Sequence, residues 1–324
     1  MRSSHVLTVS AFSLLAACGG GGGGGITTAS PDPTLSIDAN NAILVARVSY
    51  ESALASGGLG ALTGDGLVIG SVPGGVNKLD AAVAAAAKTG VGQAHVPIPA
   101  ETTPCAMSGT VTVSGEIADP ITPTLSPGDF FEIDYDACDE GLGDVIDGVM
   151  RLDINSFSGD FLNDLFNMTA TMTLTMFQVT TGQDVSSSHG DATVTLNTLN
   201  SPAVSTSLSG NSMRIDANAT SELMTNYTST IDVNGGQVPS PFTMASSGTL
   251  DSTRLSGVIS YSTPVDFQGF DADYPSSGEF LVSGGSSTLR LIAIDNINVT
   301  IELDTNGDGT VDETIQTTWA DMGV

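Results

Sequence analysis

Strict alternation of apolar and threonine side chains, between Met168 and Met176, is the feature that most constrains the fold. A period of two places the apolar side chains on one face of a β-strand and the threonines on the other. The same alternation recurs in the segments 109–113, 148–154, 191–196 and 299–303. Strands that each carry one apolar and one polar face predict a sheet that buries only one of its faces.

No helical pattern separates these strands after Cys105, which predicts an all-β, antiparallel fold. A sheet with one apolar face must curl onto itself or be covered. We therefore expect an antiparallel meander that forms an up-and-down barrel or an open half-barrel. A two-sheet β-sandwich is the alternative, because the period alone does not separate the two. Pairs such as Asp147-Gly148 and Ser247-Gly248 are interpreted as hairpin punctuation, that is, as residues at the turns between consecutive strands.

Two short N-terminal helices are expected before the strands. The first runs from Ala42 through Val48, with N-caps offered by Asp38, Asn40 and Asn41, and Gly57-Gly58 is expected to end it. The second covers residues 77–88, whose alanine content favours a helix with a thin apolar face. We expect both helices to pack on the sheet or on each other.

The N-terminus has the order of charged, apolar and small segments that is typical of a secretory signal. Arg2 precedes an apolar run from Val6 to Leu15, which leads into Leu15-Ala16-Ala17-Cys18 and the glycines 19–25. The run is too short for a membrane-spanning helix, which needs roughly 20 residues. The segment resembles the lipobox of bacterial lipoproteins, and the resemblance implies cleavage before Cys18 and attachment of lipid to its thiol.

These features predict the organisation and location of the chain. The expected segments are a signal peptide (1–17), a lipidated cysteine with a glycine-rich tether (18–35), a helical segment that packs on the sheet (36–100) and an antiparallel β domain (101–324). Gly19, where other lipoproteins carry aspartate, fits delivery to the outer membrane under the sorting pattern of that class. We expect a cell-envelope protein that contacts the membrane through its N-terminal lipid, on the periplasmic or the surface side.

The net charge limits which partners the chain can bind, and its cysteines indicate the compartment in which it works. The chain carries 36 acidic and 8 basic residues, a formal net charge of −28, which excludes nucleic-acid binding through a basic patch. An exported chain meets oxidising conditions, so Cys105 and Cys138 are expected to pair, with free thiols as the alternative. Restriction of the unfolded chain by this disulfide would contribute roughly 4 kcal/mol.

The best local motif for a ligand lies between Asp304 and Asp312. Oxygen-bearing side chains stand at positions 1, 3, 5 and 9, glycine stands at position 6, and a carbonyl near position 7 adds an oxygen, as a calcium loop requires. The expected calcium ligands are Asp304, Asn306, Asp308, Thr310 and Asp312. Ile315 replaces the glutamate of an EF-hand, and strands are expected on both sides, Asn298 to Leu303 and Thr314 to Trp319. The motif looks like the strand–loop–strand calcium hairpins of integrin-type propellers, with a structural calcium ion; a metal-free polar hairpin is the alternative.

Catalytic signatures are weak in this sequence. The sequence contains no Gly-x-Ser-x-Gly motif, which would place a nucleophilic serine on a sharp turn. We interpret His95 as part of a linker and His189 as part of the turn 186–190. Carboxylates crowd around Cys138, and we interpret their number as coincidence and not as a catalytic pair; they are Asp129, Asp134, Asp136, Asp139 and Asp144.

The methionine-rich stripe supplies one further hypothesis. Met168, Met172, Leu174 and Met176 are expected on one face, where they form core or line a site for a hydrophobic small molecule. Our leading expectation is a non-enzymatic structural or ligand-binding envelope protein, whose partner is such a molecule or another envelope protein. The alternatives are a carrier or sensor of a hydrophobic ligand and a calcium-dependent envelope hydrolase.

Several motifs together resemble uncharacterised β-rich lipoproteins of Gram-negative bacteria. The resemblance covers most of the mature chain and implies no activity. The motifs are the lipobox with its glycine spacer, Pro127-Gly128-Asp129, the segments 134–138 and 274–278, and the loop 304–312 with Thr317-Thr318-Trp319.

Overall fold

The computed structural model describes residues 34–64, 96–118, 125–139, 141, 143–160, 165–270 and 273–324. The predicted signal and lipidated Cys18, the second predicted helix at 77–88, and His95 lie outside the described residues. Within the described residues, no helix is both long and apolar enough to cross a membrane.

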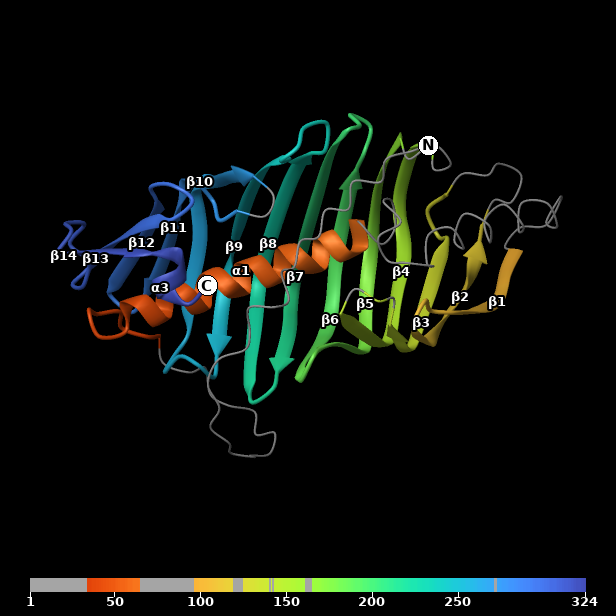
Figure 1. Cartoon of the computed structure of the whole chain (residues 1–324), viewed down its shortest axis with the longest axis horizontal. Coiled ribbons are helices and arrows are strands. Elements are labelled where there is room, and N and C mark those ends of the chain that lie inside the picture. Colours follow the sequence, from red (N-terminus) through yellow and green to blue (C-terminus); the bar gives the residue numbers. More distant parts are fainter. Residues whose placement is uncertain are drawn as a thin grey trace. The chain divides into compact units, whose positions relative to one another are not determined.

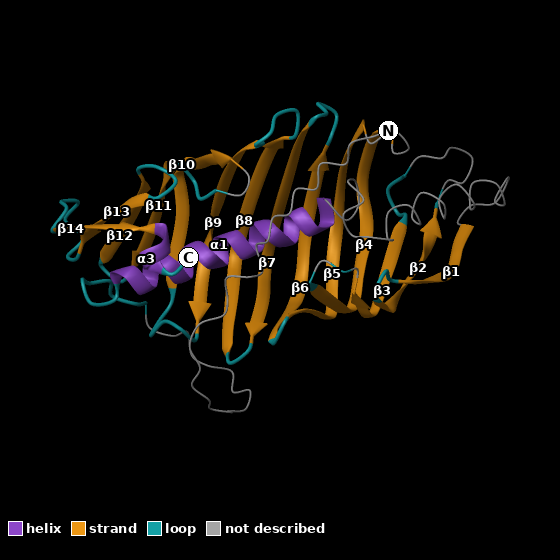
Figure 2. Cartoon of the chain, viewed as in Figure 1, coloured by secondary structure: helices purple, strands orange, loops and turns teal. Residues whose placement is uncertain are grey.

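Fourteen strands follow one another across one sheet in the order in which they occur in the chain, from β1 to β14 (Figures 1 and 2). Neighbouring strands pair antiparallel, as between β4 and β5 and between β12 and β13. In this strand order β1 and β14 each have one neighbour and are the two edges. The predicted all-β antiparallel meander is therefore confirmed, in its open form.

The described residues fall into two compact units. Unit 1 extends to Ser209 and unit 2 combines residues 34–58 with 210–324, so that both α1 and β7 cross a unit boundary. The strands that lie in unit 1 or begin there are β1 (Val96–Pro104), β2 (Ser108–Ile117), β3 (Phe130–Asp139), β4 (Asp144–Asp160), β5 (Leu165–Thr181), β6 (Asp184–Asn197) and β7 (Ala203–Ala217). Those of unit 2 are β8 (Thr220–Asn234), β9 (Pro241–Ser252), β10 (Ile259–Phe270), β11 (Ser277–Gly284), β12 (Ser287–Ala293), β13 (Asn298–Asp304) and β14 (Glu313–Thr318).

Strand β5 shows how the predicted alternation becomes a two-faced sheet. Met168, Ala170, Met172 and Leu174 are buried, whereas the threonines between them are half-buried on the opposite face. The other four segments with the same period also lie in strands, namely β2, β4, β6 and β13. Burial of apolar side chains on one face, at about 25 cal/mol per Å², therefore fixes the register of these strands.

The regular alternation ends at an irregularity between β4 and β5. Met176 has a positive φ of 49° and its side chain is 67% exposed, so the apolar stripe is interrupted after Leu174 and resumes at Phe177. Gly148 faces this site with a φ of 99°, and a Cβ atom there would lie 2.2 Å from the carbonyl oxygen of Met176. Asp147-Gly148 and Ser247-Gly248 thus lie inside β4 and β9, and our interpretation of these pairs as hairpin punctuation was wrong. At Gly148 the glycine is needed for close approach of two strands, not for a turn.

Two boundaries in the β region also differ from expectation. The segment 186–190, with His189, lies within β6 and not in a turn, because the hairpin turns earlier, at Gly182, which has a φ of 64°. The sheet also begins at Val96, before the expected start of the β domain at residue 101. Prolines are tolerated there because β1 is an edge strand.

The first predicted helix exists but is longer than expected. Helix α1 (Ala42–Gly64) continues past Gly57-Gly58, because glycine lowers helix stability by about 1 kcal/mol without forcing an end and the leucines and alanine that follow favour a helix. Before it, Asp38 Oδ1 accepts the backbone N–H of Asn40 at 2.8 Å, as the predicted capping role requires. The N–H of Ile37 donates to Ser287 Oγ at 2.6 Å and ties this segment to β12.

A second helix, α3 (Trp319–Met322), replaces the end of the last predicted strand. The strand stops at Thr318, whose Oγ1 accepts the N–H of Asp321 at 3.0 Å as an N-cap. Trp319 is fully buried. The expected strand from Thr314 to Trp319 was therefore correct except for its last residue.

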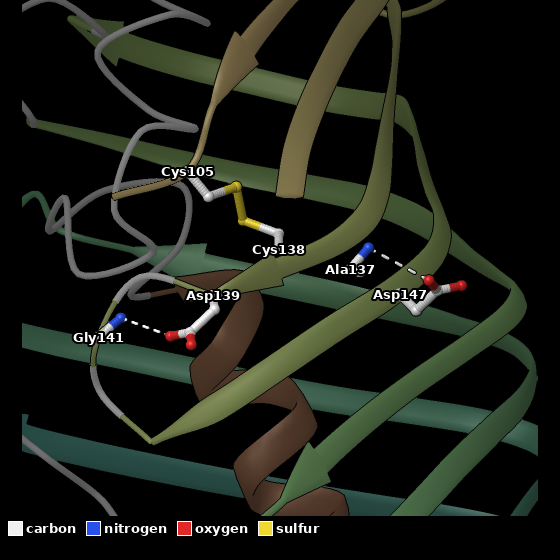
Figure 3. The surroundings of a disulfide bond; sticks show 6 residues. All are labelled: Cys105, Ala137, Cys138, Asp139, Gly141 and Asp147. Carbon is white, nitrogen blue, oxygen red and sulfur yellow. Dashed lines mark hydrogen bonds between the residues drawn. A yellow bond between two sulfur atoms is a disulfide. The ribbon is translucent and has the colours of Figure 1, made fainter. Parts of the chain in front are cut away.

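Cys105 and Cys138 form the predicted disulfide, with 5.5 Å between their Cα atoms (Figure 3). The bond joins the residue after β1 to β3 within unit 1. Near it, Asp147 accepts the N–H of Ala137 at 3.2 Å, and Asp139 accepts the N–H of Gly141 at 2.7 Å. Asp147 therefore stabilises the irregularity of β3 between Tyr135 and Cys138, and Asp139 stabilises the chain that follows β3.

We predict that the double substitution Cys105→Ser and Cys138→Ser lowers the free energy of unfolding by about 4 kcal/mol, because the unfolded chain regains the entropy of the open loop. Denaturant unfolding without reductant measures the loss. The wild-type protein unfolded with reductant is the control and should lose about the same amount. Equal stability of oxidised wild type and variant would contradict the prediction.

Candidate functional site

A buried cluster of charged side chains lies in unit 2 between α1 and the sheet. Helix α1 contributes Glu51, β8 contributes Glu222, and Arg254 follows directly after β9. One guanidinium nitrogen of Arg254 bonds Glu51 and the other bonds Glu222. Glu51 is 7% exposed and Glu222 is 5% exposed. A single arginine therefore bridges two carboxylates that have been removed from water.

Hydroxyl groups and a second arginine complete the cluster. Ser52 Oγ, one residue beyond Glu51 on α1, donates to Glu222 Oε2 at 2.5 Å. Ser252 Oγ at the end of β9 donates to the other oxygen of Glu222 at 3.5 Å. Arg47 lies one helical turn before Glu51, with 3.9 Å between Arg47 Nε and Glu51 Oε1. Two positive and two negative charges thus face one another, which limits the cost of their burial.

Burial perturbs the titration of the cluster. Desolvation raises the pKa of Glu51 above its ordinary value, although the hydrogen bond and charge of Arg254 act in the opposite direction. Burial alone would lower the pKa of Arg254, but the charges of Glu222 and Glu51 outweigh it and raise that pKa. Burial also raises the pKa of neighbouring Tyr261 to about 12, with a smaller contribution from the charge of Glu222.

An aromatic cluster holds the same helix against the sheet. The Tyr50 ring lies 5.4 Å from that of Phe267, 6.3 Å from that of Phe280 and 4.9 Å from that of Trp319. These partners come from β10, β11 and α3, and Figure 1 shows α1 crossing in front of this part of the sheet. Burial raises the pKa of the Tyr50 hydroxyl. Tyr50 and Glu51 thus use adjacent positions of α1 for apolar and ionic contact with unit 2.

The geometry of the two buried carboxylates matches a structural clamp, in which Arg254 holds Glu51 of α1 to Glu222 of β8. In a glycosidase, one carboxyl group donates a proton and the other attacks or activates water, so both must face the substrate. Here both accept hydrogen bonds from the same guanidinium group. Sequence alone does not reveal this pair, because Glu222 lies 170 residues along the chain from Ser52, the neighbour of Glu51. The available signal was the spacing of Arg47 and Glu51 by one helical turn, in a chain with only 8 basic residues.

Among the carboxylates noted near Cys138, Asp129 has a clear structural role. It is fully buried in unit 1. Its Oδ1 accepts the N–H of Ala118 at 2.6 Å and its Oδ2 accepts the N–H of Ser126 at 2.7 Å. Both carboxylate oxygens therefore stabilise the chain that leads from β2 into β3.

The predicted calcium loop forms the expected strand–loop–strand hairpin between β13 and β14. Asp304 Oδ1 accepts the N–H of Gly307 at 2.6 Å, and its Oδ2 accepts the N–H of Gly309 at 2.8 Å. Asp312 Oδ2 accepts the N–H of Thr305 at 2.9 Å, and Asn306 Oδ1 accepts the N–H of Asp308 at 2.8 Å. The hydrogen bond from Thr310 lowers the pKa of Asp308.

These carboxylates organise the loop from within. Among the described residues, no three His, Cys, Asp or Glu side chains gather as a metal-binding group. A carboxylate oxygen that accepts one N–H keeps further acceptor capacity, so the donor set of the loop remains compatible with a hard cation. Calcium binding by Asp304, Asn306, Asp308, Thr310 and Asp312 stays a prediction.

The four residues of the predicted methionine-rich stripe do not all lie on the same buried face. Met168, Met172 and Leu174 are buried on the apolar face of β5, at 2%, 1% and 5% exposure. Met176 is exposed and leaves the stripe. The first three therefore occupy positions typical of core side chains, and a hydrophobic ligand at this face stays a prediction.

We predict that Arg254→Met lowers the free energy of unfolding by about 3–5 kcal/mol, because it leaves Glu51 and Glu222 buried without their shared cation. Chemical denaturation at neutral pH measures the effect. The matched control is Arg214→Met, which removes a pair with Asp216 at a side chain 57% exposed and should cost about 1 kcal/mol or less. Equal losses in the two variants would contradict a clamp role for Arg254.

We predict that calcium raises the thermal unfolding midpoint relative to chelator, since a ligand at about 100 times its Kd stabilises the folded state by about 2.7 kcal/mol. Asp308→Ala should abolish the calcium-dependent shift. The control is the same measurement with magnesium, which suits a flexible loop of this kind less well. An unchanged midpoint with calcium would mean that the loop is a metal-free hairpin.

Comparison with protein-family models, with curated proteins and with solved structures finds no match to this chain. The geometry within each unit and the sequence are therefore what indicates a function. In unit 2 that geometry assigns the buried ionic groups to the attachment of α1.

Proposed function

We propose that this chain is a lipid-anchored cell-envelope protein with a structural or ligand-binding role and no catalytic one. Its anchor is the lipid on Cys18, and its location is the outer membrane. The support is the order of Arg2, the apolar run and Leu15-Ala16-Ala17-Cys18, followed by a glycine-rich tether that gives the folded domain slack from the headgroups.

The observation that carries the non-catalytic part is the bridge made by Arg254. A hydrolase of the carboxylate type needs at least one carboxyl group free to exchange a proton with substrate. Glu51 and Glu222 are both engaged by Arg254, and Glu222 also accepts from Ser52. Paired in this way, the buried acids stabilise the attachment of a helix to a sheet.

The exposed face of the sheet supports a scaffold or binding role. In unit 2, one row that crosses five strands consists of hydroxyl side chains only, and its members are Thr225, Thr249, Ser260, Ser283 and Thr288. Such a row offers donors and acceptors without net charge. The polar surface of the sheet is therefore suited to contact with other polar molecules of the envelope.

We predict that native mass spectrometry of the protein purified from its host membrane finds a chain that begins at Cys18 and carries lipid. Any molecule retained by the folded domain appears in the same spectrum. Cys18→Ala is the matched variant and should leave the protein unlipidated and in the soluble fraction. A wild-type chain that keeps residues 1–17, or lacks lipid, would contradict the anchor.

The same preparation tests the role of the domain. Retention of a hydrophobic molecule would favour the carrier alternative, and retention of an envelope protein or a polar ligand would support the proposal. Hydrolysis of envelope substrates that is abolished by Glu222→Gln in a variant that remains folded would contradict it.

A further inference from the structure

The two edges of the open sheet are protected to different degrees. A free edge strand exposes unpaired backbone N–H and C=O groups, and proteins block such edges with proline, lysine or bulges. Edge strand β1 contains Pro97, Pro99 and Pro104, and its pairing with β2 is irregular between Ile98 and Glu101. Edge strand β14 contains neither proline nor lysine, and its pairing with β13 runs without a register shift from Glu313 to Thr318. Among the described strands, β14 is therefore the edge that stays open to pairing.

The hydrogen bonds of β14 show which backbone groups face outward. The N–H of Trp319 donates to the carbonyl of Ile297 at 3.0 Å, which fixes the phase of the ladder. Hydrogen-bonded and non-hydrogen-bonded pairs alternate in an antiparallel ladder. Residues 313, 315 and 317 therefore bond β13, and Thr314 and Gln316 direct their N–H and C=O groups away from it. The N–H of Thr318 also points away from β13, whereas its C=O accepts the first hydrogen bond of α3, because Thr318 is the N-cap of that helix.

The solvent exposure of β14 and the charges near it indicate which kind of strand could pair with this edge. Glu313, Thr314 and Gln316 are exposed, and Ile315 and Thr317 are half-buried. Acidic side chains flank the strand on both sides, with Asp308 and Asp312 in the preceding loop and Asp321 in α3. The whole chain has a formal net charge of −28. An added strand that carries lysine or arginine would complement this charge.

A second copy of this chain fits the edge less well. The fullest antiparallel pairing of two β14 strands places Gln316 opposite its own copy. In that register the end with Asp321 lies against the end with Asp312 of the other copy, so acidic groups from both copies meet without a basic partner on these strands. Like charges placed together oppose such an association.

We propose that the free edge of β14 binds an extended, basic segment of another protein, which adds to the sheet as a further antiparallel strand. Thr314 and Gln316 supply backbone donors and acceptors and Thr318 supplies a further donor, as in strand addition to other open sheets. Glu313 and Asp321 supply the charge that selects lysine or arginine in the partner, and Asp308 and Asp312 add to it when the loop holds no calcium, so the test below is made with chelator. This binding site extends the proposed scaffold role but does not depend on the lipid anchor.

The test uses the full chain and a short peptide in which lysine alternates with valine. Amide hydrogen exchange, read by NMR at Thr314, Gln316 and Thr318, should slow when this peptide is added, and binding should weaken as salt rises. A peptide in which glutamate replaces lysine should bind at least about tenfold more weakly, because its charge repels the edge. Slowing at these three amides separates strand addition from loose attraction to the acidic surface.

Two controls keep the result independent of any folding defect. The lysine peptide with N-methyl groups on the amides that would face β14 should lose binding, because it offers no donors to the edge and the protein is unchanged. Gln316→Pro removes one outward N–H and should weaken binding by roughly tenfold, whereas Gln316→Ala keeps the backbone donor and should bind as wild type does.

Three outcomes would overturn the proposal. Unchanged exchange at Thr314, Gln316 and Thr318 would show that the edge takes no strand. Equal binding of the lysine and glutamate peptides would show that the edge does not select a basic partner. A wild-type dimer in analytical ultracentrifugation that becomes monomeric in Gln316→Pro would assign the edge to a second copy of this chain.

Discussion

The strands with a regular alternation bury apolar side chains on one face and present polar side chains on the other, so the apolar face has to be covered. In unit 2 this cover includes α1, which lies against β10, β11 and α3 through the ring of Tyr50. Burial of an aromatic side chain contributes about 1.5–3 kcal/mol. The helix is therefore as much a part of the core of unit 2 as the strands are.

Two of the described arginines, Arg47 and Arg254, pair with Glu51 of α1. Every arginine among the described residues lies within 4 Å of an acidic partner. Arg254 is the most buried of these arginines, and its loss would leave two buried carboxylates, Glu51 and Glu222, without this partner. The whole chain carries 36 acidic and 8 basic residues, so carboxylates far outnumber the cations that could pair with them.

The extent to which the structure could be predicted differs between local and distant features. The period of two from Met168 to Leu174 identified β5 and its buried face, because alternation is a property of neighbouring residues. The irregularity at Met176 depends on Gly148 of the neighbouring strand, and no local pattern reports it. The disulfide was predictable because the two cysteines after Cys18 leave one pairing. The bridge between Glu51, Glu222 and Arg254 was not, because it joins residues that only the folded sheet brings together.

The edges of the sheet follow from the same constraint. An open meander keeps two edge strands, and the prolines of β1 remove donors from one of them. β14 is protected mainly by its length, since it is only 6 residues long and Thr318 starts a helix directly after it. Its outward groups support about five backbone hydrogen bonds, each of which contributes about 1 kcal/mol net. Ordering an extended partner costs energy of a similar size, so backbone pairing alone gives weak binding, and the acidic residues at both ends of β14 have to supply the remaining affinity and the choice of partner.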